Sequence, residues 1–134
     1  MQRRLVNKSD SDMAVFSRCE DLISHTLLIT NNTKHFPKHM RFTLVNRMQD
    51  KVLDMYESLM RANEIFPESD ELRERRRTLQ RLVLVYCKEV LFFIELSLEQ
   101  GYISYKSAEY WAELVVHVKN LTGKWLQSDI KRFG

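Results

Sequence analysis

Glycine and proline are scarce in this sequence. Its 134 residues contain three Gly and two Pro, whereas a fold built from many short strands needs both residue types for its turns. The scarcity therefore disfavours a β-rich fold. It favours long helices joined by short connections.

Cysteines and long apolar runs are also few. Cys19 and Cys87 stand alone, without the Cys-x-x-Cys spacing of a metal or redox site. Leu5 and Val6 are followed at once by polar residues, so we expect no secretory signal. No apolar run approaches the roughly 18 residues that a membrane-spanning helix requires. These features predict reduced thiols and a cytoplasmic protein that does not enter a membrane.

Motifs for catalysis and metal binding are missing as well. The sequence contains no glycine-rich phosphate loop and no Gly-x-Ser-x-Gly motif. Glu113 and His117 are four residues apart, whereas di-iron sites in helix bundles use Glu-x-x-His pairs. We therefore expect no catalytic residue, no metal ligand and no cofactor. A small-molecule enzyme is the least favoured interpretation.

What the sequence does contain is a repeated pattern of amphipathic helices. Residues 1–8 carry three cations without apolar periodicity and are expected to form a flexible basic arm. Residues 9–134 are expected to form a single domain, because apolar residues recur there at helical spacing with short polar breaks between the segments. The expected helices span about residues 10–31, 38–63, 69–100 and 104–131. Four such helices predict an antiparallel up-down-up-down bundle.

Signals at the helix ends support these boundaries. Pro37 suits the first turn of the second helix, where its missing N–H is harmless. Ser69 and Ser104 can cap the third and fourth helices, and Gly101 is well placed to end the third.

The third helix carries a row of cations along one side. Arg73, Arg77, Arg81 and Lys88 are spaced by four, four and seven residues, so their side chains project along one line. Asp70 and neighbouring acidic residues can pair with the first of them. Arg81 and Lys88 have no carboxylate within one helical turn, so we expect an external anion there. The net charge is only +3, so any polyanion site must come from such local clustering.

Apolar residues lie beside this row, outside the stripe expected to face the core. They are Leu84, Val85, Leu91 and Phe92. Apolar side chains on an outer face suggest that another subunit covers them. Arg76, by contrast, projects to the core side of the helix, where it either extends to solvent, meets an inward carboxylate or marks an opening of the core.

Several short motifs resemble one known family. The stretch Phe-Pro-Lys-His-Met-Arg-Phe-Thr-Leu at residues 36–44, the Gly-Tyr-Ile-Ser at 101–104, and Tyr110, Gly123 and Trp125 carry the likeness. They resemble the four-helix-bundle family that includes the accessory variability determinant (Avd) proteins of diversity-generating retroelements and the proteins encoded in rRNA intervening sequences. The family's Leu-Gly-Gly-Trp is Thr-Gly-Lys-Trp here, so one glycine is replaced by Lys124.

The resemblance implies a non-catalytic bundle that assembles into a pentameric ring or barrel. In the Avd branch it implies binding to nucleic acid and to the reverse transcriptase, in support of mutagenic cDNA synthesis from template RNA and retrohoming. The cationic row of the third helix is the candidate binding surface, for RNA and possibly also for DNA.

The sequence is also compatible with two other interpretations. The chain could be an rRNA intervening-sequence type of bundle without a polymerase partner, or a general interaction bundle that docks an acidic protein. The sequence also leaves open whether the cationic row faces a central channel or the outside.

Overall fold

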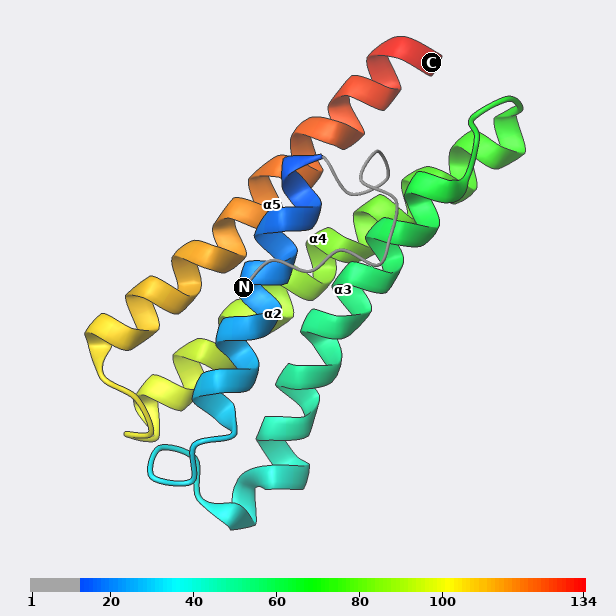
Figure 1. Cartoon of the computed structure of the whole chain (residues 1–134). Helices are drawn as coiled ribbons and strands as arrows, with labels where there is room; N and C mark the ends of the chain where they lie inside the picture. Colours follow the sequence, from blue (N-terminus) through cyan, green and yellow to red (C-terminus); the bar gives the residue numbers. More distant parts are fainter. Residues whose placement is uncertain (1–12) are drawn as a thin grey trace.

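The computed structural model describes residues 13–134, which form a bundle of four long antiparallel helices (Figure 1). The chain runs down α2, up α3, down α4 and up α5, and no strand occurs in residues 13–134. The helices are α2 (Ala14–Thr30), α3 (Asn46–Glu64), α4 (Asp70–Glu99) and α5 (Tyr105–Phe133). The expected up-down-up-down bundle is confirmed. The expected arm at residues 1–8 and the expected start of the first helix near residue 10 lie outside the described residues.

The predicted helix ends agree closely with the structure. The Ser69 hydroxyl accepts a hydrogen bond from the Leu72 N–H at 3.2 Å, and Ser104 caps α5 in the same way. After α4, Gly101 has a φ of 79°, and the Tyr102 N–H donates to the Ser97 carbonyl at 3.0 Å. This left-handed turn satisfies the last carbonyls of α4 and turns the chain toward α5.

The start of the second long helix is less regular than predicted. A short 3₁₀ turn, η1 (Lys38–Met40), leads into a π-helical turn, η2 (Arg41–Val45), before α3 begins. Phe36, just ahead of these turns, is buried. The centroid of its ring lies 5.5 Å from that of Tyr102 and 6.4 Å from that of Trp111. The buried ring therefore anchors the connection between α2 and α3 at the end of the bundle.

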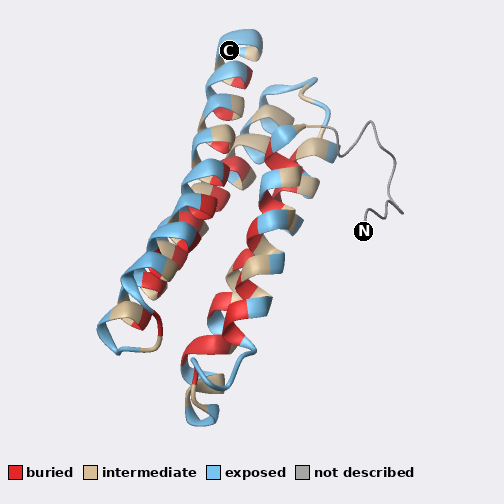
Figure 2. Ribbon diagram, turned by 60° about the vertical axis from the view of Figure 1, so that its left-hand side comes forward, coloured by how far each residue is buried: buried red, intermediate tan, exposed pale blue. Residues whose placement is uncertain are grey.

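The core lies on the inner faces of all four helices (Figure 2). On α4 the buried residues alternate at spacings of three and four, as in a helix that packs along its whole length. They are Gln80, Val83, Cys87, Val90, Ile94 and Ser97. Helical spacing alone predicts a core stripe of Leu72, Leu79, Val83, Tyr86, Val90, Phe93 and Ile94. Val83, Val90 and Ile94 are buried as predicted, whereas Tyr86 and Phe93 are only half-buried. The polar and cysteine members were not predicted.

A buried ion pair joins the start of α4 to the end of α5. Arg76 donates from Nε to Asp129 at 2.6 Å and from Nη2 at 3.1 Å, and from Nη1 to the Ile65 carbonyl at 3.0 Å. The Gln80 amide also donates to Asp129 at 2.9 Å, and the guanidinium lies 5.1 Å from the Trp125 ring centroid. Arg76 therefore meets an inward carboxylate, one of the three alternatives considered for it.

Loss of the Asp129 carboxylate should destabilise the bundle strongly. We expect D129A to lower the free energy of unfolding by about 3 kcal/mol, because it leaves a buried guanidinium without its counter-ion. Urea denaturation followed by circular dichroism measures the change. The exposed-site variant E95A should stay within about 0.5 kcal/mol of the parent protein. Restored stability in R76M/D129L would support the explanation, and a loss below about 1 kcal/mol in D129A would contradict it.

Candidate nucleic-acid interface

An open groove of about 970 Å³ runs between the outer sides of α4 and α5, in the half nearest the C-terminus. Nine residues line it: Leu84 from α4, and Lys119, Asn120, Gly123, Lys124, Gln127, Ser128, Ile130 and Lys131 from α5. Three of the nine are lysines, so the α5 side of the groove is cationic.

The cationic row of α4 lies beside this groove. Arg77, Arg81, Leu84 and Lys88 follow one another at spacings of four, three and four, so they share one side of the helix. Because Leu84 lines the groove, these cations lie on the side of α4 that borders it, although they do not line it themselves. The cations of α4 and α5 therefore lie on adjoining outer faces of the two helices.

The first cation of the row, Arg73, makes its contacts within its own chain. Arg73 forms an ion pair with Asp70 and donates to the Pro67 carbonyl at 3.3 Å, so it holds the connection between α3 and α4. Arg77 differs, because its Nη2 is buried and has no hydrogen-bond partner among the described residues. A buried donor left unpaired typically costs about 1–3 kcal/mol.

The expectation that Arg81 lacks a carboxylate is wrong. Its Nη1 lies 3.5 Å from Glu74, seven residues back, because the long side chain reaches across two turns of the helix. Both side chains are more than half exposed, at 53% and 64%, so the pair contributes little stability and exchanges readily. Lys88 is exposed and forms no ion pair with any residue in the described part of the chain.

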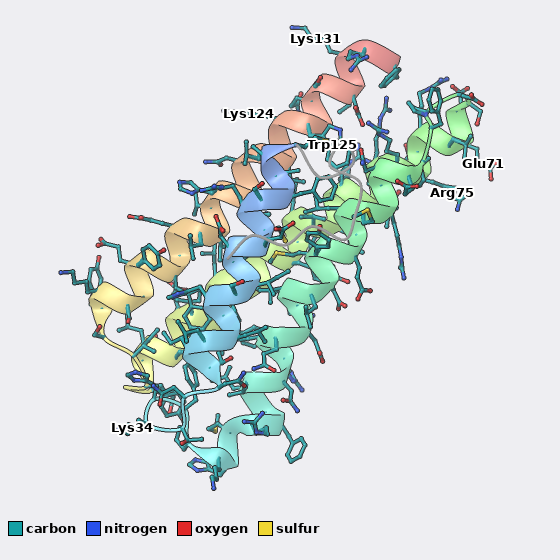
Figure 3. All side chains as sticks on the ribbon, viewed as in Figure 1. Lys34, Glu71, Arg75, Lys124, Trp125 and Lys131 are labelled. Carbon is teal, nitrogen blue, oxygen red and sulfur yellow. The ribbon has the colours of Figure 1, made fainter. Side chains whose placement is uncertain are left out.

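The three lysines of α5 were not predicted as part of the site. Figure 3 shows Lys124 and Lys131 extending from one side of α5, while Trp125 projects from another side toward the rest of the bundle. Within residues 13–134 none of Lys119, Lys124 and Lys131 forms an ion pair. The sequence shows these cations on a polar face of α5, but only the packing reveals that this face adjoins the row on α4.

The predicted subunit-interface residues divide into two pairs. Leu84 and Leu91 are half-buried between α4 and α5, and Leu91 packs against the core. Val85 and Phe92 remain 50% and 57% exposed. An apolar strip thus runs along the outer side of α4 next to Lys88, uncovered by residues 13–134 of its own chain.

The chemistry of the core thiols argues against a nucleophile. Burial raises the pKa of Cys87 to about 12, partly offset by nearby Lys119, and burial raises the pKa of Cys19 further. Both thiols are therefore protonated at neutral pH, whereas the thiolate is the reactive form. In the described residues no group of three or more His, Cys, Asp or Glu side chains could hold a metal ion. The helices of residues 13–134 include none that is long and apolar enough to cross a membrane.

Comparison of the chain with protein-family models, with curated proteins and with solved structures finds no match.

Gly123 lies in the middle of α5 at the groove, and nothing lies within 4 Å of the place where a Cβ would be. We expect G123A to raise the free energy of unfolding by about 0.5–1 kcal/mol, because alanine restricts the unfolded chain and favours the helix. The matched variant A112G, on the same helix, should lower it by a similar amount. Urea denaturation measures both. A destabilised G123A would show that the groove needs glycine for packing within the chain.

Proposed function

We propose that this protein is a non-catalytic, nucleic-acid-binding accessory protein. We name its binding surface the basic half. It comprises Lys119, Lys124 and Lys131, which line the groove, and Arg77, Arg81 and Lys88, which lie beside it on α4. The observation that carries the proposal is that these six cations lie on adjoining outer faces of α4 and α5. Of the six, only Arg81 forms an ion pair with a described residue, and that contact is exposed.

A surface of this kind suits a phosphate backbone. Flexible lysines and arginines along about 17 Å of α4 can each meet a different phosphate, since the helix rises 1.5 Å per residue. Such contacts position a nucleic acid without selecting its sequence. They also release counter-ions, so affinity should fall steeply as salt is added.

The family resemblance extends the proposal to a biological setting. The motifs at residues 36–44 and 101–104 support an Avd-like protein that acts in the cytoplasm with a reverse transcriptase and its template RNA. Its role would be to support mutagenic reverse transcription and retrohoming. A pentameric ring belongs to the same proposal, and five copies of the basic half would strengthen a weak individual contact. The exposed strip that includes Val85 and Phe92 supports such an assembly.

Two alternatives lead to different observations. If the chain is an rRNA intervening-sequence type of bundle, no polymerase gene should lie beside its gene. If it belongs to a retroelement, a reverse transcriptase gene and a pair of near-identical repeats should lie there. A general interaction bundle would bind an acidic protein in a salt-sensitive way and would not retain RNA.

Charge reversal in the basic half should weaken RNA binding. We expect K124E/K131E to lower the affinity for a single-stranded RNA about tenfold or more, because it removes two phosphate contacts and adds repulsion. Filter binding from about 50 to about 300 mM salt measures the affinity and its salt dependence. The matched variant K34E/K106E carries the same charge change outside the groove, and its affinity for RNA should fall much less. No retention at any salt, or equal loss in both variants, would contradict the proposal.

The ring has a test of its own. Light scattering coupled to size exclusion should give a mass about five times that of the 16.1 kDa chain. Substitution of Phe92 by Lys should reduce this mass, since a charge would enter the apolar strip. A monomer would contradict the ring but would leave RNA binding by the basic half to be judged by filter binding.

A further inference from the structure

A second open groove, of about 720 Å³, lies along the same two helices, nearer the connection between α4 and α5. Its charged lining has the opposite sign to that of the basic half. We name this second groove the acidic half. The charged lining consists of Glu95 from α4 and Glu109 and Glu113 from α5, together with His117 and no Lys or Arg.

The floor of the acidic half is apolar. Leu91 and Leu98 of α4 face Ala108, Ala112 and Val116 of α5 across it. The two alanines leave a shallow trough on α5, while Val116 is 37% exposed at the side. Apolar side chains of a partner could therefore reach the helix surfaces closely.

Carboxylates flank this apolar trough on both helices, Glu95 on α4 and Glu109 and Glu113 on α5. Glu95, Glu109 and Glu113 are exposed, and none of them forms an ion pair within the described residues. A nucleic acid that binds the basic half would be repelled here, because its phosphates and the glutamates carry the same charge. The occupant of the acidic half must therefore differ from the occupant of the basic half.

The dimensions fit a helix. The α5 bank of the acidic half extends from Tyr105 to His117, which is about 18 Å along the helix axis, or roughly three turns. A docked helix would place one apolar face in the trough and its flanking cations against the carboxylates on both banks, which is the usual arrangement of a helix bound in a groove.

We propose that the acidic half binds a Lys/Arg-rich amphipathic helix of a partner protein. The apolar trough supplies the contact area, and the glutamates select for cations and fix the position of the helix. The inference goes beyond nucleic-acid binding. It gives the outer faces of α4 and α5 two sites of opposite charge, so that one bundle holds a nucleic acid beside a basic protein segment.

The experiment uses a labelled helical peptide of about 14 residues, with leucines on one face and lysines beside them. Fluorescence anisotropy with the full chain measures its affinity. A second peptide, with glutamates in place of the lysines, should bind at least about tenfold more weakly. If the two peptides bind equally, charge does not select the occupant and the proposal is wrong.

Two protein variants with the same change in net charge locate the site. E109K/E113K should weaken binding of the lysine peptide about tenfold, whereas D50K/E57K, on exposed positions of α3, should weaken it less than about twofold. Equal losses would mean that only the overall charge matters and would overturn the proposal. A112W, which fills the trough without a charge change, should also weaken binding of the lysine peptide. Thermal unfolding of each variant checks that it is folded.

RNA retention by E109K/E113K separates this inference from the proposed function. It should equal or exceed that of the parent protein, because the acidic half does not contact the nucleic acid. If instead E109K/E113K and A112W turn an oligomer into smaller species, a second copy of the chain occupies the acidic half and the partner-helix proposal is wrong.

Discussion

Burial of one stripe on α4 fixes the rotation of this helix, and the rest of the structure follows from it. Val83, Val90 and Ile94 face the core, and apolar area removed from water is the main force that holds such a helix in place. Once these residues point inward, Leu84 must face α5 and Lys88 must face solvent. The cationic row and the groove are therefore consequences of core packing.

The ion pair between Arg76 and Asp129 lies at the end of the bundle where α4 begins and α5 ends. It joins the start of α4 to the last turns of α5, where the basic half lies. Lys131 lies two residues beyond Asp129 and is exposed, so it points away from the ion pair toward solvent. Arg76 is thus used inside the fold, while its neighbour Arg77 is half-buried, with Nη2 unpaired among the described residues.

The sequence predicted the bundle well because its signals are local. Serine caps, Gly101 and helical periodicity each act within a few residues. The site was predicted only in part, because it depends on contacts between distant segments. Glu74 reaches Arg81 across two turns, and Lys119 meets the cationic row only after α5 packs against α4. Polar residues that face the core, such as Gln80, were missed because their partners lie in another helix.

Lysine acetylation footprinting, with and without a single-stranded RNA of about 20 nucleotides, shows residue by residue whether the cations of α4 and α5 form one polyanion-binding surface. If they do, RNA should protect Lys88, Lys119, Lys124 and Lys131, while Lys106 is modified as in the free protein. Protection spread evenly over all lysines, or absent from these four, would contradict such a surface.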